Sequence, residues 1–148
     1  LLFDPQSEYL FSGSRDRRII QWDVATGNQL QFFESDSDWV LSLAISPHGT
    51  RLVSGDLTGA LRIWELDTGR LVGDAISSSS GWLTALHFTD ETTVQGSNRD
   101  NQVLIEWTLN TQDWISQACA ISNRQLSERE WAQFLSGEAY KPSCAPSQ

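Results

Sequence analysis

Few side chains in this 148-residue chain have the types and spacing that chemistry requires. Three carboxylates, those of Glu34, Asp36 and Asp38, crowd one short segment and could supply oxygen ligands to a cation. A calcium loop of the common twelve-residue kind also needs a central glycine and a distal glutamate, which this segment lacks. We therefore interpret the segment as a solvated loop, and we expect neither a metal site nor a bound cofactor.

The histidines and cysteines form no recognisable catalytic arrangement. His48 lies in a Pro-Gly turn, and His87 lies in an apolar strand-like segment where spacing suggests no partner. Together with Cys119 and Cys144 they match no zinc pattern, and the phosphate-loop and nucleophile-elbow motifs are missing. The two cysteines could form a disulfide, but cytosolic thiols stay reduced, so we interpret them as structural or incidental. We expect no catalytic residue, and hence no enzyme.

The feature that dominates the sequence is a repeated unit that ends in tryptophan. Residues 1–22 superimpose without a gap on residues 43–64, which lie 42 positions later. Trp22, Trp64 and Trp107 each close the same short strand, whereas Trp39 and Trp82 each open one. A period of about 42 residues with a Trp-Asp-type ending predicts one blade of a β-propeller per unit.

The second unit predicts its strands most clearly. Residues 40–46, 51–54 and 61–65 read as strands, and Pro47 and Gly49 mark the turn after the first of them. A Thr-Gly turn follows the tryptophan strand at residues 67–69 and again at 25–27. In the looser third unit we align Gln95-Gly96 with Ser54-Gly55, which makes one turn two residues shorter and the next two residues longer.

The chain is therefore predicted to be all-β, a partial β-propeller of about three four-stranded blades followed by two short helices. The blades are expected at 1–33, 34–76 and 77–110, and the first should be incomplete because Leu1 falls inside its opening strand. Residues 111–148 should form a helical cap with an extended tail, since apolar residues recur at helical spacing over 111–122 and Ser127 with Glu130 makes a capping box. The truncated first blade and the lack of any methionine predict a C-terminal fragment of a longer protein.

The charge balance excludes several classes of partner. The formal net charge is −9, and Lys141 is the only lysine among ten basic residues. No basic stripe with interleaved aromatic residues is visible, so nucleic acid is not an expected partner. An acidic chain also does not favour anionic membranes, and no apolar run is long enough to span one. We expect a cytoplasmic protein that binds other proteins, with missing propeller blades supplied by the parent chain or by oligomerisation.

Residues 1 to about 110 resemble the WD-repeat family in its bacterial form. The resemblance implies a platform for protein contacts. The tail resembles the segment that follows the last blade in many large bacterial signalling ATPases, which implies an upstream switch, kinase or caspase-like domain. The matching tail positions are Trp114, Ala118, Cys119, Leu126, Glu130, Trp131, Leu135, Tyr140 and Cys144. Packing of this tail on the last blade and binding of a partner by it both remain open.

The structural hydrogen-bond network of the family is incomplete in every unit. Its serine position holds Ser12, Ser54 and Gln95, and its aspartate position holds Asp16, Thr58 and Asp100. The position before the tryptophan should be apolar, yet the third unit has Glu106 there. Either that blade is distorted at Glu106 or the carboxylate pairs with an arginine.

The favoured function is a non-catalytic WD-repeat interaction scaffold or sensor module, the C-terminal part of a larger bacterial signalling protein. The alternatives are the regulatory end of an ATPase, kinase or caspase-like enzyme, or a non-functional gene remnant. Contacts are expected from charged and polar turn residues at the propeller rim, although each could also be an ordinary solvated turn. These candidates are Arg15, Arg17, Arg18, Glu34, Asp36, Asp38, Asn98 and Arg99.

Overall fold

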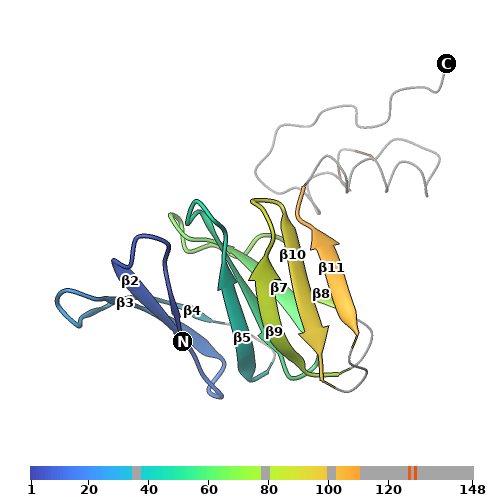
Figure 1. Ribbon diagram of the computed structural model, residues 1–148, viewed down its shortest axis with the longest axis horizontal. Helices are drawn as coiled ribbons and strands as arrows, with labels where there is room; N and C mark the ends of the chain where they lie inside the picture. Colours follow the sequence, from blue (N-terminus) through green and yellow to red (C-terminus); the bar gives the residue numbers. More distant parts are fainter. Residues whose placement is uncertain (35–37, 78–80, 100–102, 111–126, 128, 130–148) are drawn as a thin grey trace. The chain divides into compact units, whose positions relative to one another are not determined.

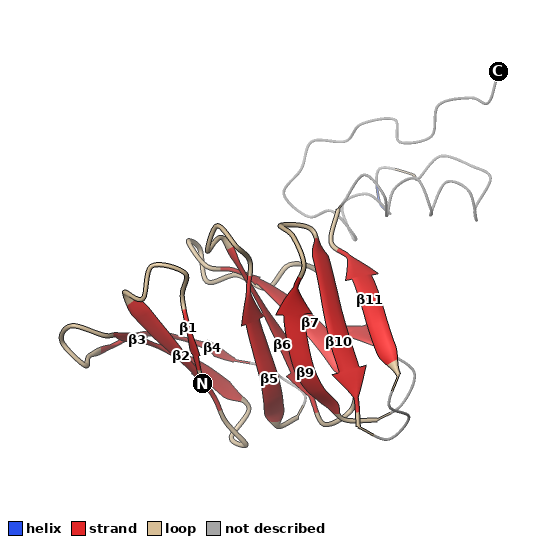
Figure 2. Cartoon of the chain, in the orientation of Figure 1, coloured by secondary structure: helices blue, strands red, loops and turns tan. Residues whose placement is uncertain are grey.

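The computed structural model describes residues 1–34, 38–77, 81–99, 103–110, 127 and 129, and the described strands form three antiparallel sheets (Figures 1 and 2). The chain divides into two compact units, Leu1–Trp107 and Thr108–Gln148. Apart from Ser127 and Arg129, the two expected C-terminal helices lie outside the described residues, as do Cys119 and Cys144, so those expectations stay predictions.

The first two sheets each have four strands in sequence order. The first sheet contains β1 (Leu2–Phe3), β2 (Tyr9–Gly13), β3 (Arg18–Asp23) and β4 (Gln29–Glu34). The second sheet contains β5 (Val40–Ile45), β6 (Arg51–Asp56), β7 (Ala60–Glu65) and β8 (Ile76–Ser77). The opening strand of the first sheet was expected to be incomplete, and β1 is a two-residue strand paired with β2, whereas its counterpart β5 has six residues.

The third sheet has three strands among the described residues, β9 (Leu83–Phe88), β10 (Thr93–Asn98) and β11 (Leu104–Thr108). Three successive antiparallel sheets of three or four strands match a partial propeller. The expected strands of the second unit are confirmed. Both ends of β6 and of β7 lie within two residues of the bounds predicted for them.

The recurring Thr-Gly turn has the same geometry in both units. Gly27 and Gly69 have φ of 71° and 68°, a left-handed conformation that residues with a side chain rarely adopt. The Gly27 N–H donates to the Asp23 carbonyl, and the Gly69 N–H donates to the Glu65 carbonyl, both at 2.8 Å. In both units, this turn therefore leads the chain from the strand that carries the tryptophan towards the outermost strand of the sheet.

The first and second sheets share a core. Phe11, Ile19 and Phe33 of the first sheet pack with Leu52 and Trp64 of the second. The rings of Phe33 and Trp64 meet edge to face, with centroids 5.6 Å apart. Each of these side chains is almost fully buried, which is worth roughly 1.5–3 kcal/mol for an aliphatic or phenylalanine side chain.

The second and third sheets meet along their inner strands. Ser42 of β5 donates its hydroxyl to the backbone carbonyl of Leu83 at 2.7 Å, and the Leu83 side chain is fully buried. A Cβ on Gly55 would lie 2.7 Å from Leu83, so this glycine permits the close approach of the two sheets. Leu83 therefore fixes the start of β9 against β5 and β6.

Strand pairing corrects the alignment of the third unit. Leu43 pairs with Ser54 in the second sheet, and the equivalent Leu86 pairs with Gly96 in the third. Likewise Val40 pairs with Asp56, and Leu83 pairs with Asn98. Gly96 rather than Gln95 therefore occupies the serine position, because the turn between β9 and β10 is one residue shorter than its counterpart and not two.

Candidate functional site

The described candidate contact residues all come from the end of the sheets at which β5 and β9 begin. In Figure 1 the arrows of β5 and β9 point the same way, so their first residues lie at the same end, next to the β2–β3 and β6–β7 turns and to the last residue of β10. We call this end the entry rim. Its members used below are Arg15, Arg17, Arg18, Glu34, Asp38, Trp39, Leu57, Trp82 and Arg99.

The β2–β3 turn is attached to the start of β5. The Val40 N–H donates to the Ser14 carbonyl at 3.1 Å, and the guanidinium of Arg15 lies 4.5 Å from the centroid of the Trp39 ring. On the other side of the tryptophan, the Leu57 N–H donates to the Trp39 carbonyl at 3.2 Å. Trp39 is thus held by two turns, and its side chain remains 37% exposed.

A second arginine-tryptophan pair stands at the start of β9. The guanidinium of Arg99 lies 4.8 Å from the centroid of the Trp82 ring, and the Arg99 N–H donates to the Trp82 carbonyl at 3.0 Å. Trp82 is 38% exposed, almost the same as Trp39. A guanidinium over an indole at an exposed site contributes about 0.5–1 kcal/mol, enough to fix the orientation of both side chains.

Opposite charges meet on the outer part of the entry rim. Arg18 of β3 and Glu34 of β4 are cross-strand partners, with the guanidinium nitrogen 3.6 Å from the carboxylate oxygen. Both side chains are more than half exposed, so the pair adds little to stability and stays accessible to a partner. Arg17 is exposed with φ of 71°, and the Asp38 carboxylate accepts the Trp39 N–H at 2.8 Å.

One expected contact residue is not at the surface. Asn98 was expected in an exposed turn, but it ends β10 and is only 3% exposed. Its place matches that of Asp56, which is 2% exposed, because both residues pair with the first residue of an inner strand. Asn98 therefore cannot touch a partner. Asp36 and Asp100 lie outside the described residues, so their proposed roles stay predictions.

The tryptophan–serine hydrogen bond of that network is present in the first two units. The indole N–H of Trp22 donates to the Ser12 hydroxyl at 2.9 Å, and that of Trp64 donates to Ser54 at 3.3 Å. In the third unit Gly96 replaces the serine, and a Cβ there would lie 2.8 Å from the Trp107 ring.

The aspartate position is also met in part. The Asp16 carboxylate accepts the Arg18 N–H at 3.1 Å and so closes the β2–β3 turn. In the second unit Thr58 stands at this position, and its hydroxyl donates to Asp56 at 2.6 Å.

Sequence reasoning missed the most buried polar group of the second sheet. The Asp56 carboxylate also accepts the N–H groups of Thr58 and Ala60 at 2.8 and 3.0 Å, and Arg62 donates to it from Nη1 at 2.8 Å. The side chains of Asp56 and Arg62 are 3% and 9% exposed. A signal was available, since Asp-x-Thr is a typical turn sequence and Arg62 stands two residues before the tryptophan.

Glu106 has a partner of a kind that neither sequence-based alternative named. The amide of Gln95 donates to its carboxylate at 2.9 Å, and the side chain of Glu106 is exposed. At the opposite end of the sheets, His48 Nδ1 lies 2.8 Å from Glu91, and that carboxylate also accepts the His48 N–H. The latter contact joins the β5–β6 turn to the β9–β10 turn.

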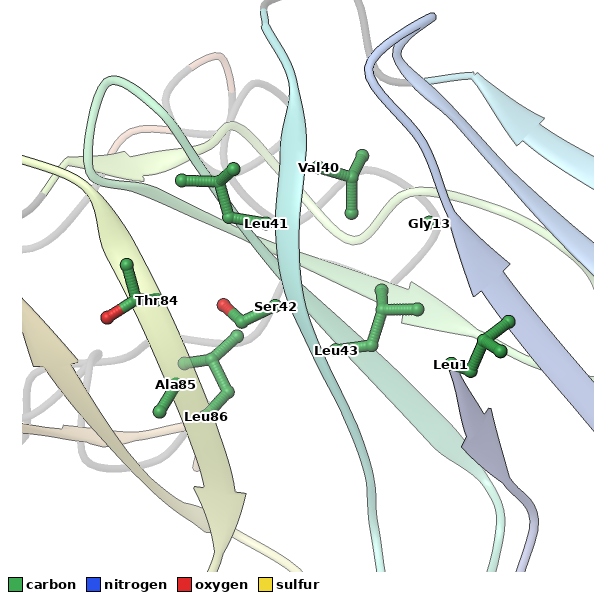
Figure 3. A pocket seen from close by; sticks show the side chains of 9 residues that line it. All are labelled: Leu1, Gly13, Val40, Leu41, Ser42, Leu43, Thr84, Ala85 and Leu86. Atoms are coloured by element: carbon green, nitrogen blue, oxygen red, sulfur yellow. The ribbon is translucent and has the colours of Figure 1, made fainter.

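A hollow of about 230 Å³ lies between β2, β5 and β9 (Figure 3). It is lined by Leu1, by Gly13 of β2 and by residues of β5 and β9, and none of these side chains is ionisable. Across the described ranges, no group of three or more His, Cys, Asp or Glu could hold a metal ion. Within those same ranges, no helix is long and apolar enough to cross a membrane.

Comparison with known proteins finds a family model that matches the first two repeats. Residues 1–23 and 27–65 match the WD40 family model described as "WD domain, G-beta repeat". The chain is 29% identical over 109 residues to the Transcription initiation factor TFIID subunit 5 of Caenorhabditis elegans, and 40% identical over 70 residues to the human Kinesin-like protein KIF21A. These matches cover 74% and 47% of this chain, but 17% and 4% of the two relatives.

A solved structure titled "Structure of U3-55K" has the same fold. It superimposes with a TM-score of 0.58 at 23% sequence identity, and the match covers 72% of this chain and 38% of the other. Residues 1–23 and 27–65 are therefore similar to WD40 repeats, and the three sheets match part of a WD propeller.

Proposed function

We propose that this chain, with its WD40 repeats, is a non-catalytic protein-interaction scaffold whose partner docks on the entry rim. The observation that carries the proposal is the pair of half-exposed tryptophans, Trp39 and Trp82, each under an arginine at the same end of neighbouring strands. Tryptophan and arginine are the residues most enriched among the energetically dominant contacts of protein interfaces.

The arrangement lowers the cost of binding because it is largely fixed beforehand. Backbone hydrogen bonds hold the turns against the strands that carry the two tryptophans, and the stacked arginines lose less side-chain freedom when a partner arrives. The accessible Arg18–Glu34 pair would favour partners with complementary charges and hinder others.

The wider setting is also part of the proposal. We place the chain in the cytoplasm as the C-terminal part of a larger bacterial signalling protein, in which the propeller senses a partner for an upstream domain. The residue pattern of the tail, from Trp114 to Cys144, supports this setting. The alternatives are the regulatory end of an ATPase, kinase or caspase-like enzyme, or a gene remnant without function. Sequencing the gene upstream of Leu1 distinguishes these alternatives. Further blades and a catalytic domain there would favour the regulatory end of an enzyme over a gene remnant.

One sheet face supports the expectation of further blades. In the second sheet, Leu52 and Trp64 lie on a face that the first sheet covers, and they are 0% and 3% exposed. The corresponding face of the first sheet includes Phe3 and Phe32, which are 55% and 54% exposed. We propose that a blade of the parent chain or of a second copy covers this face.

A capture experiment tests the docking surface. The chain and two variants serve as bait in a lysate of the source organism: Arg15→Ala with Arg99→Ala at the entry rim, and His48→Ala at the opposite end as the matched control. We expect the unmutated chain and the His48→Ala control to capture the same proteins, and we expect the rim variant to capture none of them. Equal capture by all three baits would contradict docking on the entry rim.

A further inference from the structure

The three turns at the entry rim place an arginine, a leucine and an arginine at equivalent positions. Strand pairing makes Asp56 equivalent to Asn98, so the next residues, Leu57 and Arg99, are equivalent as well. The gapless overlay of the first two units makes Arg15 the counterpart of Leu57. Each of these residues approaches an inner-strand tryptophan, Arg15 and Leu57 at Trp39 and Arg99 at Trp82.

Two groups of these residues, Arg15 with Trp39 and Leu57, and Trp82 with Arg99, lie at the same end of two sheets that pack against each other, and we call them together the stripe. Its members are Arg15, Trp39, Leu57, Trp82 and Arg99, and every one of them is partly or fully exposed. A guanidinium stacked on an indole turns its face to the ring, so the N–H groups around its edge stay free for acceptors in the same plane.

The charges of these arginines are not neutralised by the described part of the chain. No ion pair joins Arg15, Arg17 or Arg99 to any residue in the described ranges, whereas Arg18 pairs with Glu34 and Arg62 with Asp56. The chain has 19 acidic residues against 10 basic ones, so acidic neighbours are not scarce in its composition. Within the described ranges, no ion pair therefore holds the guanidinium groups of these three exposed arginines.

We infer that the stripe binds an extended acidic peptide segment, with carboxylates on the two stacked arginines and an apolar side chain between them on Trp39, Leu57 and Trp82. Arginine suits carboxylates because its planar fork donates two parallel hydrogen bonds. A nucleic-acid strand would need cationic partners for several successive phosphates, whereas the stripe offers two arginines, which favours a peptide with two carboxylates. This inference rests on the proposed function and names the chemistry of the partner.

Fluorescence anisotropy with defined probes tests it. The probe is a fluorescein-labelled peptide that alternates glutamate and leucine, and the comparison probes are the same peptide with glutamine for glutamate and a labelled oligouridylate. We expect the acidic peptide to bind most tightly. Arg15→Ala and Arg99→Ala should each weaken its binding about tenfold, the usual effect of losing a hydrogen bond to a charged group. Arg15→Lys and Arg99→Lys should weaken it less, because the charge remains while the planar fork is lost.

Arg70→Ala is the matched control, since Arg70 is an exposed arginine in the β7–β8 connection at the opposite end. It should leave binding unchanged. Equal loss in this control, no binding of the acidic peptide, equal binding of the glutamine peptide, or preference for the oligouridylate would each overturn the inference. In one outcome, the rim variant loses its captured proteins while the unmutated chain does not bind the acidic peptide. In that case the proposed function stands and only this inference fails.

Discussion

Arg62 donates from Nη1 to Oδ2 of Asp56 over 2.8 Å, and the second sheet shields both side chains from solvent. The other oxygen of the carboxylate accepts from the Thr58 hydroxyl and from the N–H groups of Thr58 and Ala60. A buried charge with its acceptor positions occupied in this way is tolerated, whereas one that loses its partner is not.

Replacement of Asp56 by alanine should therefore be among the most destabilising changes in the chain. It leaves the Arg62 guanidinium buried without its carboxylate and opens the β6–β7 turn. We expect a loss of about 3–5 kcal/mol in the free energy of unfolding, measured by urea denaturation. Asp67→Ala, in an exposed turn, is the control and should change it little. A loss below about 1 kcal/mol for Asp56→Ala would show that the pair is not structurally important.

The two tryptophan-serine hydrogen bonds should contribute different amounts to the free energy of unfolding. Trp64 is 3% exposed, so Ser54→Ala leaves a buried indole N–H without its acceptor at a cost of about 1–3 kcal/mol. Trp22 is half-buried, and water can replace the hydroxyl after Ser12→Ala, which should cost about 0.5 kcal/mol or less. Urea unfolding should therefore show that Ser54→Ala is less stable than Ser12→Ala, although the hydrogen bond lost in Ser54→Ala is the longer of the two. The reverse order would contradict burial as the deciding factor.

Gly96→Ala should destabilise the third sheet. Its new methyl would meet the Trp107 ring at 2.8 Å and the side chains of Leu83 and Leu86 at 3.0 Å. Overpacking of this kind costs about 1–3 kcal/mol, and the thermal midpoint should fall accordingly. The neighbour Ser97→Ala, on a half-exposed position of the same strand, should leave the midpoint nearly unchanged. An unaltered midpoint in Gly96→Ala would mean that Trp107 does not lie over this glycine.

The turn carboxylates predict a dependence of stability on acid pH. Hydrogen bonds from the Thr26 hydroxyl and N–H lower the pKa of Asp23, and the Thr92 N–H and hydroxyl lower the pKa of Asp90. A carboxylate whose pKa is lowered in the folded state stabilises the fold above the pKa of the unfolded chain, and that contribution is lost as the pH falls through the folded value.

Asp23→Asn and Asp90→Asn should accordingly flatten the decline in thermal midpoint below about pH 4, because asparagine does not titrate. Asp67→Asn serves as the comparison from another exposed turn. A steeper acid decline in either of the first two variants would contradict the direction of the shifts.

Much of the fold was predictable because the repeat fixes it. Trp22 and Trp64 recur at one spacing with no gap between the units, so strand limits and the Thr-Gly turns could be read from the first two units. The third unit was misaligned because the alignment matched the two glycines Gly55 and Gly96. The strand register instead places Gly96 at the position of Ser54. Sequence similarity cannot locate a one-residue deletion inside a turn, whereas hydrogen-bond register can.

The candidate site was predictable in its place but not in its contacts. The charged turns could be assigned to one rim, yet the stacking of Arg15 on Trp39 and of Arg99 on Trp82 depends on how neighbouring strands begin side by side. Asn98 was misplaced for the same reason as Gly96, since the shifted register moves it from the turn to the buried end of β10.

The most direct measurement is site-specific photo-crosslinking to the native partner. A photoreactive residue replaces Arg17 on the entry rim in one protein and Asp67 at the opposite end in the other, and both positions are exposed. Arg17 is outside the stripe, so its replacement leaves the proposed contacts intact, and we expect the partner to be crosslinked from position 17 and not from position 67. Crosslinking from position 67 alone would contradict the assignment of partner binding to the entry rim.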